Sequence, residues 1–212
     1  MDAHDYANLL SKHLQAIQLE PGEKIRQCTD DSFGCGYYNP KWAITSHGRV
    51  FSIRKSGLKE LSPYRAEPKS SQIQLENSFA KKYICLSRLV CVYFTPPEHF
   101  LNFPEEYKIT PDMTIEEREE RFRKHWHVHH IAPRDYTGKS VEDNDNIDNL
   151  LPLPAHIHMG IHKIINHQKC NPILQVSNIN HTVTVGSWLI RHMVWHDPEP
   201  IWDYDSILID DL

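Results

Sequence analysis

The sequence has no run of about 18 apolar residues, the length that a membrane-spanning helix requires. Its N-terminus has no basic segment followed by an apolar one, so we expect no secretory signal. The five cysteines are odd in number and widely spaced, and no C-x-x-C pair occurs. A disulfide framework and a cysteine zinc ribbon are therefore both disfavoured. These absences predict a reduced, cytoplasmic protein with no membrane segment.

An overall excess of positive charge is also missing, since the net charge is −5. Residues 41–92 nevertheless carry ten Lys and Arg against three Glu, a local charge of +7. Residues 171–212 carry one Arg against six acidic residues. Clustered positive charge is typical of a face that binds a polyanion, but it would also suit an ordinary solvated sheet. Charge alone leaves both interpretations open.

The hydrophobic pattern predicts an α+β fold. An amphipathic helix is expected over residues 4–18, because apolar residues recur there at helical spacing. Residues 41–94 are typical of β structure, with a hairpin around His47-Gly48 and a change to helix near Ser87.

Further elements are expected in the second half of the chain. Residues 114–124 predict a charged helix that begins after Thr114, with Glu117 three residues later as in a capping box. After Pro172 we expect one or two strands, then a short helix over WLIRHMVWH, residues 188–196. The acidic C-terminus could be a lid that mimics nucleic acid or a solvated tail, and we favour the tail.

Histidines gather in two stretches of the chain, HWHVHHI and NLLPLPAHIHMGIH. Residues 126–132 are expected to form a strand, whose alternation places His127 and His129 on one face and His130 on the other. A polar loop then leads into the second stretch.

The second stretch predicts a strand and a helix. The strand covers residues 147–153, and the helix begins at Pro154. His158 and His162 are four residues apart on that helix and share one face, which suits metal chelation. Such a unit can fold back so that this pair meets the histidines at the end of the first strand. Three imidazoles can hold a metal, and a fourth can act as a general base because imidazole titrates near neutrality.

The stretch HHIAPRDYTG…NIDNLLPLPAHIHMGIH resembles the HNH endonuclease motif, the ββα-metal nuclease unit, and in particular its colicin-DNase-type variant. In that variant a His pair, a central Asn and an H-x-x-x-H pattern form the site. The central Asn would be Asn149, nine residues before His158, with His162 four residues further on. The loop between His130 and Asn149 is a few residues longer than in the colicin type. His127 stands where that variant has an acidic residue, which leaves the role of that acid open.

The resemblance implies a role for each residue of the motif. The ligands of a divalent metal would be His129, His158 and His162. Mg²⁺ would serve for activity, and Zn²⁺ would also fit three imidazoles. His130 would be the general base that activates water, while the metal neutralises phosphate charge and stabilises the leaving 3′ oxygen. Asn149 would orient the His130 loop or bind the metal, and Arg134 could contact the phosphate. The products would carry 5′-phosphate and 3′-hydroxyl ends.

Each part of this motif is weak alone, but the ordered set HH…N…H-x-x-x-H spans only 34 residues. It favours a metal-dependent DNA endonuclease of homing or restriction type. The alternative is a non-catalytic DNA-binding protein with a structural zinc site, and a third interpretation is an RNA-directed nuclease. We expect four other histidines to be structural or surface residues: His125, His127, His156 and His167.

The stretches PKWAITSHGRVFSIRKSG and KKYICLSRLVCVYFTPPE are similar to the N-terminal DNA-binding region of phage homing-type HNH endonucleases. Gly48 would permit a tight turn from which Arg49 can point outward. Five cations could neutralise DNA phosphates without reading the base sequence: Arg49, Arg54, Lys55, Lys59 and Arg88. The large apolar residues are expected in the core: Trp42, Ile44, Val50, Phe51, Leu89 and Phe94.

Four segments are therefore predicted. They are an N-terminal helix and loop (1–40), a basic β-rich DNA-binding module (41–97), an HNH nuclease domain (98–170) and a C-terminal extension with an acidic tail (171–212). DNA is the expected partner, and the sequence leaves the oligomeric state open.

Overall fold

The structure is a computed structural model of the chain, and it confirms the α+β class. It describes residues 1–28, 39–66, 70–76, 81–96, 98–101, 103–110, 112–133, 144–169, 172–177, 182–185 and 188–191. The helices are α1 (Ala3–His13), α2 (Leu86–Phe94), α3 (Glu98–Leu101), α4 (Ile115–His125) and α7 (Ala155–Gln168), with short 3-10 turns η1 (Leu14–Ala16) and η2 (Ile147–Asn149). The strands are β1 (Ile25–Gln27), β2 (Trp42–Thr45), β3 (Val50–Arg54), β4 (Gly57–Leu61), β5 (Tyr64–Ala66), β6 (Ser70–Glu76), β7 (Lys81–Cys85), β8 (Trp126–His130), β9 (Leu150–Pro154), β10 (Leu174–Ser177), β11 (Thr182–Val185) and β12 (Trp188–Arg191).

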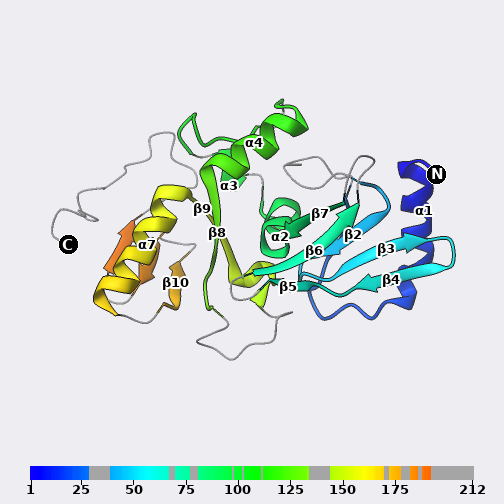
Figure 1. Cartoon of the computed structure of the whole chain (residues 1–212), viewed down its shortest axis with the longest axis horizontal. Helices are drawn as coiled ribbons and strands as arrows, with labels where there is room; N and C mark the ends of the chain where they lie inside the picture. Colours follow the sequence, from blue (N-terminus) through cyan, green and yellow to red (C-terminus); the bar gives the residue numbers. More distant parts are fainter. Residues whose placement is uncertain are drawn as a thin grey trace.

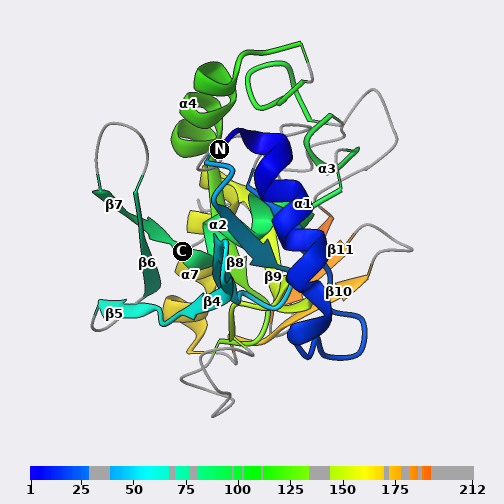
Figure 2. The same cartoon turned by 90° about the vertical axis from the view of Figure 1, so that its right-hand side faces the viewer.

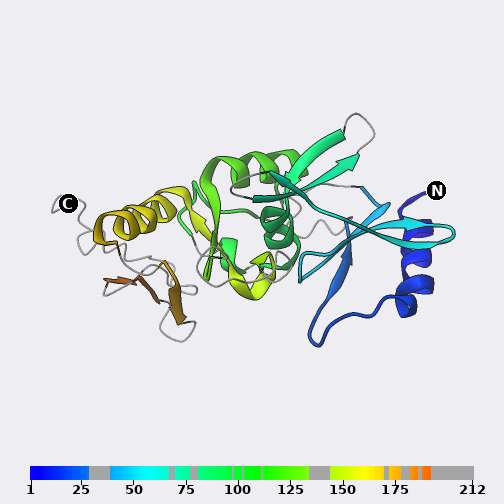
Figure 3. The ribbon, with the colours of Figure 1, turned by 60° about the horizontal axis from the view of Figure 1, so that its bottom comes forward.

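A four-stranded antiparallel sheet, in the order β1-β2-β3-β4, lies with α1 at one end of the molecule (Figures 1 and 3). The predicted hairpin is confirmed, because β2 and β3 are joined by a turn in which Gly48 has φ +82°. Strand β1 pairs with β2, so residues before 41 belong to the same sheet. The predicted core residues of this sheet are buried: Trp42, Ile44, Val50 and Phe51.

Helix α2 lies at the centre of the molecule, packed on one side against β6 and β7 and on the other against β8 and β9 (Figure 2). It begins at Leu86, which confirms the predicted change from strand to helix. Nearly all of its side chains are buried, including Leu89, while Phe94 is partly buried against the same core. This shared core joins the strands of residues 41–85, the basic part of the chain, to the histidine-rich strands β8 and β9.

Two other predicted helix starts are explained by their caps. Thr114 accepts a hydrogen bond from the Glu117 amide, and the Glu117 carboxylate accepts one from the Thr114 amide, as the capping box predicted. In the same way Asp2 and Asp5 cap α1.

The C-terminal sheet β10-β11-β12 corrects one prediction. Residues 188–191 form a strand, not the start of a helix, because they pair along their whole length with β11. Trp, Leu and Ile suit a pleated sheet when a neighbouring strand supplies the hydrogen bonds. The acidic tail lies outside the described residues. No helix in the described part of the chain is both long enough and apolar enough to span a membrane.

Candidate metal and proton-transfer site

Strands β8 and β9 form an antiparallel hairpin, and α7 follows directly, so residues 126–168 form a ββα unit. The second strand begins later than expected, because residues 147–149 form the turn η2, capped by the Asn146 side chain. Pro154 is both the last strand residue and the helix N-cap. The core face of α7 consists of buried isoleucines: Ile157, Ile161 and Ile164. The adjoining side of the helix carries His158 and His162, whose rings approach His129 on β8.

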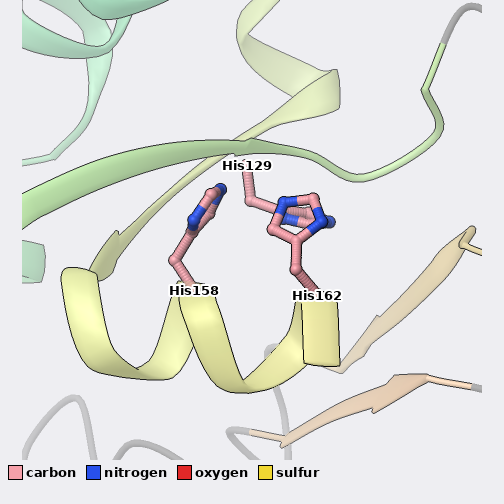
Figure 4. A group of neighbouring side chains, drawn as sticks. All are labelled: His129, His158 and His162. Atoms are coloured by element: carbon pink, nitrogen blue, oxygen red, sulfur yellow. The ribbon is translucent and has the colours of Figure 1, made fainter. Parts of the chain in front are cut away.

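Three histidines converge between β8 and α7, as Figure 4 shows. One nitrogen from each of His129, His158 and His162 lies within 4.8 Å of the others. The ring centroids of His158 and His162 are 4.6 Å apart, and the ring centroid of His129 lies 5.2 Å from that of His158 and 5.1 Å from that of His162. Among the described residues, this is the group of His, Cys, Asp or Glu found able to hold a metal.

The burial of His129 fits a metal ligand. Its side chain is 2% exposed, and both ring nitrogens are buried without a hydrogen-bond partner. A buried polar atom without a partner costs about 1–3 kcal/mol, so two on one ring need an explanation. A metal ion bound to one of them would supply it. Three neutral imidazoles suit Zn²⁺ and similar ions.

The electrostatics of the cluster favour the neutral form of His129 and His158. Burial, together with the charges that His158 and His162 would carry, lowers the pKa of His129 to about 3. Burial and the neighbouring histidines lower the pKa of His158 to about 4. A neutral imidazole is the form that binds a metal. These two rings are therefore in their metal-binding form at neutral pH.

His130, the next residue along β8, meets a carboxylate that the sequence alone did not identify. Its Nε2 lies 2.9 Å from Oδ1 of Asp145, which is 2% exposed. A carboxylate only accepts hydrogen bonds, so Nε2 carries the hydrogen and Nδ1 keeps its lone pair. His130 remains 21% exposed, which allows contact with water. The pair therefore has the form of a general base with an orienting acid.

Asn149 links the two ends of the segment between β8 and η2 (residues 131–146), which we call the site loop. Its Oδ1 accepts from the Ala132 amide at 2.8 Å, and its Nδ2 donates to the carbonyls of Ala132 and Asn144. Both ends of its buried side chain are thus occupied by backbone groups. Of the two roles foreseen for Asn149, this geometry favours orienting the loop.

The turn between β2 and β3 supports the same loop. The Ile147 amide donates to the Ser46 carbonyl at 2.8 Å. A Cβ on Gly48 would lie only 3.2 Å from the Asp145 carbonyl oxygen. The basic sheet is therefore in direct contact with the segment that carries Asp145 and Asn149.

The predicted DNA-contacting cations differ in their surroundings. Arg54, Lys55 and Lys59 are exposed along the β3–β4 hairpin. Arg49 does not point freely outward, because its guanidinium pairs with two carboxylates, Glu60 at 2.9 Å and Glu23 at 3.3 Å. These carboxylates already balance its charge.

Other predicted residues have separate positions. The guanidinium of Arg88 lies over the Phe122 ring at 5.2 Å. His156 is turned away from the cluster, and its Nδ1 lies 3.3 Å from the hydroxyl of Tyr107. Arg134 lies outside the described residues.

No model of a known protein family matches the chain, and no curated protein matches it. Among solved structures the chain is similar to the HNH homing endonuclease I-HmuI, whose structure is described as showing DNA binding and cleavage. The identity is 18% and the TM-score 0.41, and the match covers 70% of this chain. It covers 61% of I-HmuI, less than two thirds of that protein's length.

Proposed function

We propose that the chain is a metal-dependent DNA endonuclease of the HNH, or ββα-metal, type. The observation that carries this proposal is that two neighbouring histidines on β8 have different partners. His129 joins a three-imidazole cluster on one face, while His130 pairs with a buried carboxylate on the other. Metal-assisted phosphodiester hydrolysis requires a bound cation and, beside it, a positioned general base.

Each residue of the site then has a proposed role. The cation would be held by His129, His158 and His162. A divalent ion bound there would neutralise charge on the scissile phosphate and stabilise the leaving oxygen. His130 takes a proton from the attacking water at Nδ1, since Nε2–H is donated to Asp145. Asn149 would hold together the backbone at Ala132 and Asn144, next to that pair. Cleavage gives 5′-phosphate and 3′-hydroxyl ends.

The donor set and the chemistry favour different cations. Three imidazoles favour Zn²⁺ by ligand softness, whereas phosphate chemistry commonly uses Mg²⁺. We propose Mg²⁺ for activity and Zn²⁺ as an ion that also occupies the site. The identity of the active metal is therefore part of the test.

DNA is the proposed substrate because the exposed cations lie on the sheet that contacts the site loop. Arg54, Lys55 and Lys59 can each neutralise a phosphate. Arg49 and Arg88 could also contribute, though both already have partners within the chain. Contacts of this kind give affinity without sequence readout. Whether the enzyme is of homing or restriction type depends on its target specificity.

The test is cleavage of supercoiled plasmid with Mg²⁺, Mn²⁺, Zn²⁺ or EDTA. His130→Ala should be folded but inactive, and His167→Ala, which changes an exposed histidine on α7, should cut like the wild type. An inactive wild type on several DNAs, which unfolds when EDTA is added, would instead support a structural zinc site. Cutting of single-stranded RNA but not duplex DNA would support the RNA-directed alternative.

A further inference from the structure

His127 lies beside the metal cluster without belonging to it. Its Nδ1 is 3.3 Å from Nδ1 of His158, and the two rings are perpendicular, with centroids 5.0 Å apart. His127 is exposed, and it is not one of the three residues whose nitrogens converge. We propose that His127 is a positioning residue that accepts the Nδ1–H of His158 and so directs Nε2 of His158 to the metal. This inference rests on the proposed metal site.

The register of β8 brings His127 to this position. His127 and His129 are two residues apart on one strand face, and both rings contact His158, which lies on α7. His129 approaches His158 from within the cluster, while His127 is outside it. The ring of His158 therefore contacts the two other members of the cluster and, in addition, His127.

The chemistry fixes the direction of this hydrogen bond. Both groups are imidazoles, so one Nδ1 must donate and the other accept. If His127 donated, the hydrogen of His158 would sit on Nε2, and neither of its nitrogens could bind a metal. If His158 donates, Nε2 keeps its lone pair. Only the second arrangement is compatible with a three-imidazole site.

Metal-binding histidines usually donate their second N–H to an outer acceptor, which fixes the tautomer and the orientation of the ring. Carboxylates, carbonyl groups and water are the usual acceptors. Here an imidazole would have that role, provided by a residue that the sequence predicted to be structural or on the surface.

The experiment measures Co²⁺ and Zn²⁺ binding to the EDTA-stripped full chain without DNA. His127→Phe keeps a ring against His158 but removes the acceptor, whereas His127→Gln keeps an acceptor oxygen. His167→Phe is the matched control. We expect His127→Phe to weaken Co²⁺ binding about tenfold or more. His127→Gln and His167→Phe should stay within about threefold of the wild type.

A second readout does not depend on metal. Nitrogen NMR of the histidine rings near pH 8 should show His158 protonated at Nδ1 in the metal-free wild type, and this preference should be lost in His127→Phe. The inference is overturned if His127→Phe binds Co²⁺ as the wild type does. It is also overturned if the visible Co²⁺ spectrum of that variant shows a changed coordination number, since His127 would then be a direct ligand. A chain that passes these tests but cuts no DNA would refute the proposed nuclease and leave this inference standing.

Discussion

Replacing Asp145 by Asn tests whether the buried carboxylate orients His130. The substitution keeps the size of the side chain and one oxygen that can accept from Nε2–H. It removes the negative charge that faces His130 at 2.9 Å. Any change in cleavage therefore reports on charge and orientation and not on lost volume.

The magnitude follows from the type of hydrogen bond. A hydrogen bond to a charged group contributes about 1.5–3 kcal/mol, and a neutral one about 0.5–1.5 kcal/mol. The difference of about 1–1.5 kcal/mol, if it is expressed in the transition state, corresponds to a roughly five- to twelvefold lower kcat. Removing the base itself by His130→Ala should reduce kcat by about 10²–10⁴-fold. Asp145→Asn should therefore lie between the wild type and His130→Ala.

Stability should change in the other direction. The second oxygen of Asp145, Oδ2, is buried without a hydrogen-bond partner. Because a buried charge is more costly than a buried neutral amide, Asp145→Asn should leave the free energy of unfolding unchanged or raise it. Urea denaturation monitored by tryptophan fluorescence measures this change.

The assay is single-turnover plasmid cleavage at saturating metal, with Asp148→Asn as control, since Asp148 is exposed in the same loop. Adding Asp145→Asn to His130→Ala should cost no further activity, because residues that act as one unit are not additive. If Asp145→Asn cuts within twofold of the wild type while His130→Ala is inactive, Asp145 does not orient the base and the argument is wrong.

Three further predictions concern the turn, the cluster and the hairpin. Gly48→Ala should lower the free energy of unfolding by about 1–2 kcal/mol because of the positive φ. It should also slow cleavage, because the Cβ of the new alanine would press on the site loop at Asp145. The control is Gly22→Ala, which has a similar positive φ but open space around it and should therefore change stability alone. In EDTA, the free energy of unfolding should fall as the pH drops from 6.5 towards 3, because the pKa of His129 is about 3 in the folded state and near 6.5 in the unfolded state. His129 contributes up to about 1.4 kcal/mol per pH unit to this slope, and His158, with a folded pKa of about 4, adds to it. In His129→Gln the slope of a urea series against pH should be shallower. Changing Lys55 and Lys59 together to Gln should reduce the slope of log binding constant against log salt by about two, measured by fluorescence anisotropy with duplex DNA.

The convergence of the three histidines could be predicted because it depends on two local rules. Alternation along a strand assigns His129 to one face, and a spacing of four residues aligns His158 with His162 on a helix. The capping box of α4 was also local and was confirmed. In contrast, the strand at residues 188–191 depends on a neighbouring strand, so its apolar run alone could not distinguish strand from helix.

The partner of His130 could not be predicted, because it depends on contacts between distant parts of the chain. Residues 142–145 read EDND and offer three acids, and nothing in their order marks Asp145. Three contacts fix the backbone around Asp145. They are the turn η2, the hydrogen bond from the Ile147 amide to the Ser46 carbonyl, and the close approach of Gly48 to Asp145. The turn of the basic sheet thus supports the loop that presents the carboxylate. A displacement of that sheet on binding DNA would reach His130 through this contact. Gly48→Ala adds backbone strain and also disturbs this contact, whereas Gly22→Ala adds backbone strain alone, so comparing the two variants isolates the effect on the positioning of the base.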